Sequence, residues 1–508
     1  MHSKSMPSSA AHPRRPRLLR IGALAAALAL AGCAVGPDFH SPSLPKAAEG
    51  PYTESPLAPR TVEARGDHVG QAGAAQSFAP GRDIPARWWE LFRSPELDQL
   101  IRAALEHNPS LDAAQAALRQ ARENYNAAAG TTYFPSVNAQ LGGGRQRAIL
   151  SGETPNEFNV YSGTIGVSYT LDLFGGERRQ LEGLMAATEY QRFQTEAAYQ
   201  TLIANVVTTA VQEASLRSQL NATRELLKAQ EAQLAIIVKQ VELGAQPRAT
   251  ALTQDTLVAQ TRAQVPPLDK ALAQTRHQLA VLAGRFPGEG GLPEFHLDAL
   301  RLPEQLPVSL PSALARQRPD IRASEALLHQ ASAQVGVATA SQYPQITLSG
   351  SYGTQHTVLP NMDIGNTLWN AMGGLTQPLF NGGALSAKRR GAEAAYQQAE
   401  AQYRSTVLKA FQNVADSLRA VESDALALKA QTEAETRARE SLEVHTSQYK
   451  LGGISYLALL DAERSYQQAR IGLIQAQATR YSDTVALFAA LGGGWWNQPA
   501  TLDKNSGS

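Results

Sequence analysis

Apolar residues in the second half of this chain repeat with a helical period. Between residues 407 and 428 they are spaced alternately by four and three positions, at Val407, Phe411, Val414, Leu418, Val421, Ala425 and Leu428. This heptad spacing is typical of helices that pack along their length as a coiled coil. It lies inside a proline-free segment, Gly383–Leu451, and a second such segment of similar length covers Gly176–Leu243. At about 1.5 Å of rise per residue, each segment predicts a helix on the order of 100 Å long.

Four shorter segments alternate between apolar and polar positions, which is the period of a β-strand. The clearest is Asn159–Leu173, and Pro135–Leu141, Gln345–Gly353 and Thr367–Phe380 show weaker forms of the same pattern. With their flanking residues, all except Gln345–Gly353 are long enough to cross a bilayer as tilted strands of about 9 to 11 residues. The soluble alternative is a pair of β-hairpins packed on a helical body.

Strands that span a membrane must pair all their backbone groups, so they must close into a barrel. Four strands are too few, because single-chain barrels begin at about 8 strands. The chain must then combine its strands with those of symmetric copies, as closed cyclic assemblies do. A dimer would supply eight strands and a trimer twelve, and the residues alone do not choose between them. The connections 142–159 and 354–366 are polar, and we expect them to be the outer loops.

Landmark residues recur at a nearly constant offset, which divides the chain into two repeats. Four pairs match: Pro135 with Pro344, Phe174 with Phe380, Leu243 with Leu451, and Leu282 with Leu491. Each half therefore predicts a helix, a strand, a loop, a second strand, a long helix, a tight turn and a returning helix. We place the two repeats at residues 93–300 and 301–496.

Each long helix is expected to end in a tight turn. The segments Leu243-Gly244-Ala245 and Leu451-Gly452-Gly453 predict helix ends, because glycine readily adopts the left-handed conformation that terminates a helix. Pro247 suits the first turn of the returning helix. Pro266-Pro267, in the middle of that helix, predicts a kink or a break that the second repeat lacks. Each repeat should thus form a long helical hairpin.

Residues 1–32 have the features of a secretory signal peptide. Arginines precede an apolar segment, residues 21–31, which is too short to span a bilayer. The segment Leu30-Ala-Gly-Cys33 follows, and Cys33 is the only cysteine of the chain. It resembles a bacterial lipobox, whose cysteine carries N-acyl and S-diacylglycerol lipid and begins the mature chain. The alternative is a cysteine that merely lies at an ordinary cleavage site. Ala34 is not the aspartate that favours inner-membrane retention, so the resemblance implies sorting to the bacterial outer membrane.

The segments that flank the repeats differ from them in composition. Residues 33–92 are rich in Pro, Gly, Ala and Ser and predict an extended, lipid-anchored arm. The apolar segment Trp88-Trp89-Glu-Leu-Phe92 ends this arm and is expected to anchor it to the body. Residues 497–508 predict a flexible tail. Removing residues 1–32 changes the net charge from +1 to −4, which gives no reason to expect nucleic acid as a partner.

No residue pattern predicts an enzyme. The histidines are scattered without the spacing of a metal site. The segment Gly142-Gly-Gly144 lacks the lysine and hydroxyl residue of a phosphate-binding loop, and there is no Gly-x-Ser-x-Gly motif. Cys33 is assigned to the lipid. We therefore expect no catalytic residue, no metal site and no cofactor other than the covalent lipid.

Two charged residues just beyond the turn Leu451-Gly452-Gly453 allow two interpretations. Asp461 and Arg464 are three positions apart and lie on one helical face. They could form a surface pair, which contributes about a few tenths of a kcal/mol. Alternatively, copies from adjacent subunits could form a charged ring that narrows a channel, with Leu457 as an apolar plug.

Basic residues also follow the last strand of each repeat, at Arg178-Arg179 and at Lys388-Arg389-Arg390. Solvated helix starts are one interpretation of these clusters. Contact with lipid phosphates at a membrane edge is the other.

An ordered set of short motifs covers residues 33–496: Leu-Ala-Gly-Cys33, Gly36-Pro-Asp-Phe, Trp88-Trp89-x-x-Phe92, Asn108-Pro, Phe134-Pro, Leu173-Phe-Gly-Gly, Val265-Pro-Pro-Leu, Arg318-Pro-Asp-Ile, Leu379-Phe-Asn-Gly-Gly, Leu451-Gly-Gly, Leu459-Leu-Asp-Ala-x-Arg464 and Leu491-Gly-Gly-Gly-Trp495. In this order they resemble the TolC-like outer membrane efflux protein family, lipoprotein branch, the outer membrane factors of RND-type tripartite efflux systems. The resemblance implies an α+β membrane protein: a trimeric, twelve-stranded transmembrane β-barrel with four strands per chain, continued by a long antiparallel α-helical, coiled-coil periplasmic tunnel.

The same resemblance implies a passive, gated duct that exports small molecules across the outer membrane. Its implied partners are two further copies of the chain, a periplasmic adaptor (membrane fusion) protein, an inner-membrane RND pump and outer-membrane lipids. The family's periplasmic gate falls on Leu457, Asp461 and Arg464. Its adaptor-contact tips fall on Leu243, Gly244 and Ala245 in the first repeat and on Leu451, Gly452 and Gly453 in the second.

One departure from the family pattern is Gln246-Pro247 at the first tip, which makes a stiffer turn than the resemblance leads us to expect. The alternative function is a lipid-anchored helical periplasmic spacer or adaptor that forms no pore. Adaptors usually have a single helical hairpin between small β domains, and two repeated halves disfavour that alternative. The residues do not specify the exported substrate.

Overall fold

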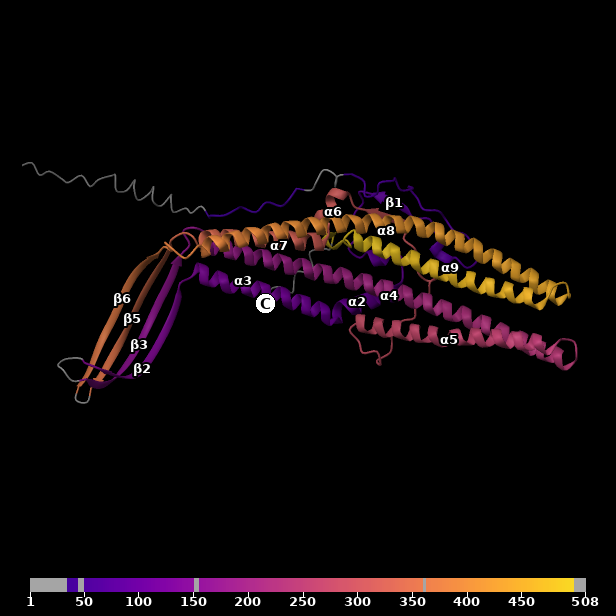
Figure 1. Ribbon diagram of the computed structural model, residues 1–508, viewed down its shortest axis with the longest axis horizontal. Coiled ribbons are helices and arrows are strands. Elements are labelled where there is room, and N and C mark those ends of the chain that lie inside the picture. Colours follow the sequence, from indigo (N-terminus) through magenta and orange to yellow (C-terminus); the bar gives the residue numbers. More distant parts are fainter. Residues whose placement is uncertain (1–33, 44–49, 150–154, 360–361, 498–508) are drawn as a thin grey trace, which may run out of the picture. The chain divides into compact units, whose positions relative to one another are not determined.

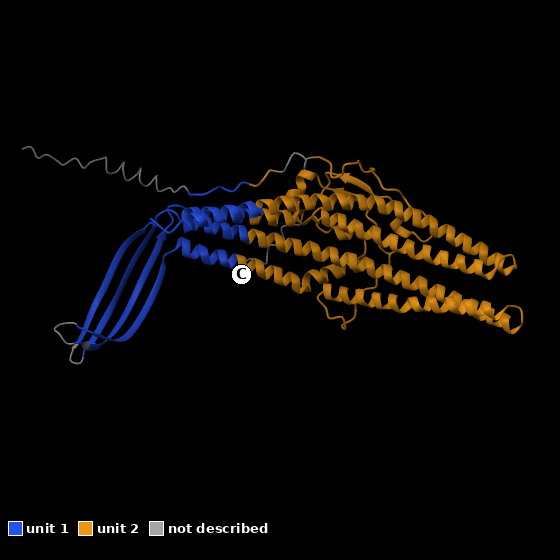
Figure 2. Ribbon diagram, in the orientation of Figure 1, with its two compact units in different colours: residues 1–40, 122–187, 328–399 blue, residues 41–121, 188–327, 400–508 orange. Residues whose placement is uncertain are grey.

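The computed structural model describes residues 34–43, 50–149, 155–359 and 362–497 (Figure 1). The predicted signal peptide, Cys33 and residues 498–508 lie outside the described residues. The chain forms two compact units (Figure 2). Unit 1 contains residues 1–40, 122–187 and 328–399, and unit 2 contains residues 41–121, 188–327 and 400–508.

Each half of the chain contributes one helix of 67 residues and one of 35 residues. The long helices are α4 (Gly176–Glu242) and α8 (Ala384–Lys450), and α5 (Arg248–Leu282) and α9 (Tyr456–Ala490) return from them. The proline-free segments thus mark both long helices to within one residue at either end. The shorter helices are α2 (Pro95–His107), α3 (Pro109–Tyr133), α6 (Pro311–Gln317) and α7 (Pro319–Ala340). None of the described helices has an apolar stretch long enough to cross a membrane.

Helices α4, α5, α8 and α9 all end in the same kind of turn. A glycine with positive φ follows each of them: Gly244 (72°), Gly284 (71°), Gly452 (76°) and Gly492 (96°). The next amide then donates back across the last turn, as Ala245 N–H does to the Gln240 carbonyl at 2.8 Å. Such a bond satisfies a carbonyl that a helix end would otherwise leave unpaired. The glycines therefore fix where each helix stops.

Unit 1 contains a four-stranded antiparallel sheet, in the order β2-β3-β5-β6. Its strands are β2 (Ser136–Ala148), β3 (Asn156–Leu171), β5 (Gln345–Leu359) and β6 (Met362–Thr376). Each repeat supplies one hairpin, and the two hairpins pair through the central strands, with Leu171 opposite Ile346. In the single chain β2 and β6 are open edges, and every residue of β2 is exposed.

The strands extend further than the sequence predicts, into the segments that were expected to be loops. The segments 142–159 and 354–366, expected to be loops, are largely strand, because β2 continues to Ala148 and β5 to Leu359. The alternation stops at Gly142, but backbone pairing does not require apolar side chains. Glycine also leaves room for a large neighbour across the ladder: a Cβ at Gly143 would lie 3.2 Å from the Tyr161 ring.

Helix α5 is not broken at Pro266-Pro267, which lie inside a single helix. Each proline lacks the N–H that would bond the carbonyl four residues earlier. These carbonyls belong to Arg262 and Ala263, which are exposed, as are both prolines. Water can therefore satisfy the freed groups, and the helix continues.

Unit 2 holds most of the core and much of the predicted arm. Strand β1 (Ser77–Pro80) of the arm pairs in parallel with β4 (Gln305–Val308), and two 3-10 helices, η2 (Gly70–Gly73) and η3 (Trp88–Phe92), lie on either side of β1 in the chain. Trp88 is fully buried and stacks on Phe488 of α9, with ring centroids 5.3 Å apart. The aromatic cluster therefore anchors the arm to the body. A third 3-10 helix, η4 (Trp495–Asn497), ends the described chain.

Candidate gate and adaptor-contact tips

Both helical hairpins turn at the same end of unit 2 (Figure 1). The leading residues of the turns, Leu243 and Leu451, are 74% and 87% exposed. The second returning helix begins with Ser455, whose side chain accepts a hydrogen bond from the Ala458 N–H. Pro247, in the same position of the first repeat, makes no side-chain cap. Each turn thus ends its helix at a glycine and exposes an apolar side chain.

The predicted gate residues lie on the first three turns of α9. Asp461 and Arg464 are brought together, with 4.0 Å between a carboxylate oxygen and a guanidinium nitrogen. Their side chains are 68% and 52% exposed, and Leu457 is also exposed. An exposed pair at this distance contributes little to stability. The pair therefore adds little to the stability of its own chain, and all three side chains are exposed in the single chain.

A second group of residues near the gate was not predicted from the sequence. The Tyr456 hydroxyl of α9 donates to the side-chain carbonyl of Gln254 in α5. Gln254 is fully buried, and its amide donates to the Gln230 carbonyl of α4 at 2.9 Å. Tyr456 thus connects the second hairpin to both helices of the first. In the sequence, the signal for this group is that Gln254 and Tyr456 are polar residues among the apolar positions of the two returning helices.

Glu463 lies two turns after Tyr456 on α9. Burial raises the pKa of its carboxyl to about 7. Its Oε2 has no hydrogen-bond partner within the part of the chain that the structure describes. A carboxyl in such surroundings favours its neutral form.

Further along, amide groups join the hairpins. Gln467 of α9 donates to Gln264 of α5 at 2.9 Å, and Gln475 donates to Gln219 of α4 at 3.5 Å. A neutral hydrogen bond contributes about 0.5–1.5 kcal/mol net. Each of these side-chain bonds between the two hairpins is therefore individually weak.

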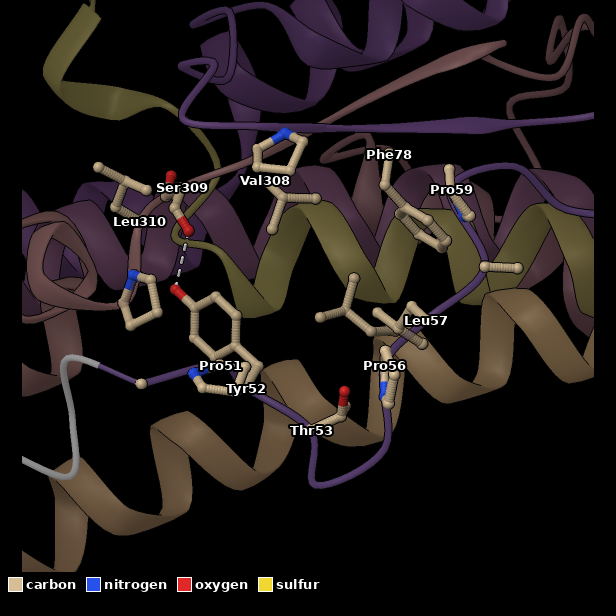
Figure 3. A pocket seen from close by; sticks show the side chains of 15 residues that line it. Pro51, Tyr52, Thr53, Pro56, Leu57, Pro59, Phe78, Val308, Ser309 and Leu310 are labelled. Carbon is tan, nitrogen blue, oxygen red and sulfur yellow. Dashed lines mark hydrogen bonds between the residues drawn. The ribbon is translucent and has the colours of Figure 1, made fainter.

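An apolar pocket of about 550 Å³ lies elsewhere in unit 2 (Figure 3). The arm forms one side of it, with Tyr52 donating to the Ser309 carbonyl at 3.0 Å, and Phe78 and Leu310 line it as well. None of its lining residues is charged, and none belongs to the gate or to the tips. Across the described residues, no three His, Cys, Asp or Glu side chains are arranged to hold a metal ion.

Comparisons with known proteins agree on one family. The model of the family described as "Outer membrane efflux protein" matches residues 100–285 and 310–493. The pyoverdine export outer membrane protein OpmQ of Pseudomonas aeruginosa is 32% identical over 80% of this chain and 87% of its own length. The toluene efflux pump outer membrane protein TtgC of Pseudomonas putida is 30% identical over 94% of this chain and 96% of its own. The solved structure of the outer-membrane channel OprN, 28% identical, matches with a TM-score of 0.78 over 91% of this chain and all of that one.

Proposed function

This chain belongs to the outer membrane efflux protein family, and we propose that it is the outer-membrane channel of a tripartite efflux system. The observation that carries this function is the family match, which covers both halves of the chain. The likeness to a solved outer-membrane channel over nearly the whole fold agrees with it. The alternative of a helical spacer or adaptor is not supported, because the related proteins are outer-membrane channels and outer-membrane components of export systems. Relatives named for pyoverdine and for toluene differ in cargo, so we assign no substrate class.

We propose that three copies close a twelve-stranded barrel. The open edges β2 and β6 support this proposal, since a strand edge left unpaired in a membrane is strongly disfavoured. The helical hairpins of the three copies would continue the barrel as a coiled-coil tunnel into the periplasm. A lipid on Cys33 would add a second attachment to the outer membrane.

Export through such a channel is passive, so the energy must come from its partners. We propose an inner-membrane RND pump as the energy source and a periplasmic adaptor that contacts the tips 243–245 and 451–453. The exposed leucines at both tips support this contact. No step of this function requires a catalytic residue, and we propose that the chain is not an enzyme.

We assign the closed gate to Leu457, Asp461 and Arg464. In a trimer these exposed side chains on α9 would meet their copies in the other subunits, where a carboxylate and a guanidinium can pair between chains. Their weak pairing within one chain supports this role. Opening would then require separation of contacts between subunits together with the hydroxyl and amide contacts between the hairpins.

The gate assignment is tested by single-channel conductance in planar bilayers. We expect Asp461→Ala with Arg464→Ala to raise the conductance of the closed channel severalfold, because the ring of charges is removed. The matched control is Arg437→Ala with Glu440→Ala, an exposed pair of the same spacing on α8, which should change nothing. Equal conductance in wild type and gate variant would exclude these residues from the gate. Native mass spectrometry of the extracted particle tests the trimer and the lipid together.

A further inference from the structure

Residues 34–39 lie in a site that is built by both repeats within unit 1. The Val35 N–H donates to the Phe174 carbonyl at 3.0 Å, in the turn between β3 and α4. A Cβ at Gly175 of that turn would lie 2.6 Å from the Ala34 Cα, and a Cβ at Gly36 would lie 2.5 Å from the Gly336 Cα in α7. Such distances are shorter than real Cβ contacts, so the approach requires glycine. The backbone of the segment is therefore in direct contact with both repeats.

Side chains hold the other end of the segment. Arg179 of α4, only 7% exposed, pairs with Asp38 at 2.6 Å and with Glu182 at 2.7 Å. The Arg179 guanidinium holds the pKa of the Asp38 carboxyl below its usual value. On α7, His329 Nε2 lies 2.9 Å from a carboxylate oxygen of Glu182. The Phe39 ring stacks on the His329 ring, with the two centroids 4.3 Å apart. The segment thus joins a buried charge of the first repeat to a ring of the second.

The repeat-equivalent surface, which α8 and α3 form, shows that this site is specific. When α8 is aligned with α4, and α3 with α7, none of the side-chain contact groups recurs, and all the equivalent residues are exposed: Ala387 for Arg179, Arg390 for Glu182, Ala127 for Gly336 and Gln120 for His329. Gly383, the equivalent of Gly175, has nothing within 4 Å of its hypothetical Cβ. The site is therefore specific to the surface formed by α4 and α7 and is not a consequence of the repeat.

We propose that Ala34–Phe39 is a clasp that fastens the first repeat to the second where β3 ends, at Leu171, and β5 begins, at Gln345. The clasp also attaches the mature N-terminus to the fold independently of any lipid. The clasp bonds to Phe174, which follows β3 and whose ring stacks at 4.8 Å on Tyr343, the residue that precedes β5. By fixing this junction, the clasp holds the hairpins in register and leaves β2 and β6 free to pair with other copies.

The clasp itself is tested by hydrogen exchange of the amides of residues 35–39 in the purified full-length protein. In the wild type we expect the Val35 amide to be protected. Gly36→Val should speed its exchange by about tenfold or more, because φ is +101° at this position and the added side chain meets Gly336. The double variant Asp38→Ala and Phe39→Ala changes only the segment and should have the same direction of effect. His40→Ala is the matched control, because among the described residues this exposed ring bonds to the Asp38 carbonyl and to no residue of either repeat.

Independence from the lipid is tested with Cys33→Ser, exported on a signal that is cleaved without lipidation. We expect the same protection of residues 35–39 as in the wild type. Exchange at the rate of an unstructured peptide in the wild type would overturn the clasp, and loss of protection in Cys33→Ser alone would overturn its independence.

The role in assembly rests on the proposed trimer, so it has a separate readout. We expect Gly36→Val to lower the yield of heat-resistant oligomer on gels severalfold, while His40→Ala leaves it unchanged. Equal yield in Gly36→Val and wild type would overturn the assembly role. If no variant forms an oligomer, the proposed channel fails, whereas the exchange result still decides the clasp.

Discussion

The first and second repeats share the lengths of their long and returning helices but place buried charges at different positions. In the first repeat Glu213 of α4 is fully buried and accepts hydrogen bonds from Arg217, from Arg276 at 3.0 Å and from the Phe295 N–H at 3.1 Å. Arg276 also donates to the Leu292 carbonyl at 3.3 Å. These bonds hold the segment that leaves α5. The equivalent residues of the second repeat are uncharged: Val421, Ala425 and Thr484.

A buried charge of the second repeat, Arg480, lies one turn before Thr484, the equivalent of Arg276. Arg480 of α9 is fully buried and donates to the carbonyls of Ala72 and Ala74, at 2.7 and 2.8 Å, and to the Thr61 hydroxyl at 3.1 Å. These residues belong to the arm. The equivalent residue of the first repeat is Leu272.

The difference shows what a buried charge does in this fold. An irregular segment that crosses a helix brings backbone N–H and carbonyl groups that no regular ladder satisfies. In each repeat the charge lies where such a segment crosses, and the same position is apolar or neutral where none does. The repeats therefore share a helical frame and differ in the segments that they fasten to it.

The largest expected effect comes from making the first repeat like the second at one residue. Glu213→Val removes the acceptor that Arg217, Arg276 and the Phe295 N–H share, and we expect it to lower the free energy of unfolding by about 3–5 kcal/mol. Thermal unfolding in detergent, followed by circular dichroism, measures it. The control is the triple variant Glu213→Val, Arg217→Ala and Arg276→Thr, which copies the second repeat fully and should recover most of the loss. A triple variant less stable than the single one would contradict this account of the buried charge.

The reciprocal change in the second repeat should have a somewhat smaller effect. Arg480→Leu removes three hydrogen bonds to the arm but also removes a buried charge, so we expect a loss of about 2–4 kcal/mol. Residues 61–74 should become accessible to protease, as mass spectrometry of the fragments would show. Arg437→Leu, an exposed arginine on α8, is the control. Unchanged protection of the arm in Arg480→Leu would mean that β1 and the aromatic cluster suffice to hold it.

The second repeat has a pair of neighbouring carboxyls, Asp424 and Asp483, that has no counterpart in the first. Burial and the neighbouring Asp483 raise the pKa of Asp424 to about 7, although Arg480 opposes the shift. The equivalent residues of the first repeat are Leu216 and Thr275. Since unfolded aspartates titrate near about 3.9, the folded state binds this proton more tightly. The bound proton therefore stabilises the folded state. Its contribution is complete below the unfolded pKa of about 3.9 and is lost as the pH rises through about 7.

We expect Asp424→Asn to reduce this loss of stability between pH 5 and pH 8.5. The difference should be no more than about 1 kcal/mol, because the carboxyl is half-buried and water screens it. Unfolding temperatures of wild type and variant at both pH values measure it, with Leu216→Asn as the matched change in the first repeat. Parallel pH profiles for wild type and Asp424→Asn would show that Asp424 holds no extra proton.

The sequence predicts those parts of the fold that local chemistry decides. Both long helices were located to within a residue, because absent prolines and terminal glycines act on the backbone directly. The outer ends of the strands were missed, since the alternation stops at Gly142 whereas backbone pairing continues to Ala148. The positions of Asp461, Arg464 and the tips along the helical hairpins can also be predicted from the sequence, because they depend on spacing along the chain.

Buried charges could not be recognised in the same way. Glu213 and Arg480 look like residues of a solvated helical face, and only packing against a distant segment shows otherwise. Arg179 was expected either in water or against lipid phosphates, and it is buried against Asp38 and Glu182. The residues after Cys33 were predicted as part of an extended arm, because no local pattern shows that Gly175 and Gly336 leave space for them.

The smallest expected effect lies at the two tips, where the repeats begin their returning helices differently. Ser455 caps α9 through a bond of 3.3 Å from the Ala458 N–H, whereas Pro247 starts α5 with a fixed φ of −64° and no side-chain cap. Ser455→Ala should lower stability by about 0.5–1 kcal/mol, because a helix N–H loses its acceptor. Pro247→Ser supplies a cap of similar value but frees the unfolded backbone by about 0.4–1 kcal/mol, so the two contributions nearly cancel. Unfolding temperatures of both variants should therefore show a small loss for Ser455→Ala and almost none for Pro247→Ser. A clear gain in Pro247→Ser would mean that the stiff first turn is retained at a cost in stability, and adaptor affinity would then be the property to measure in that variant.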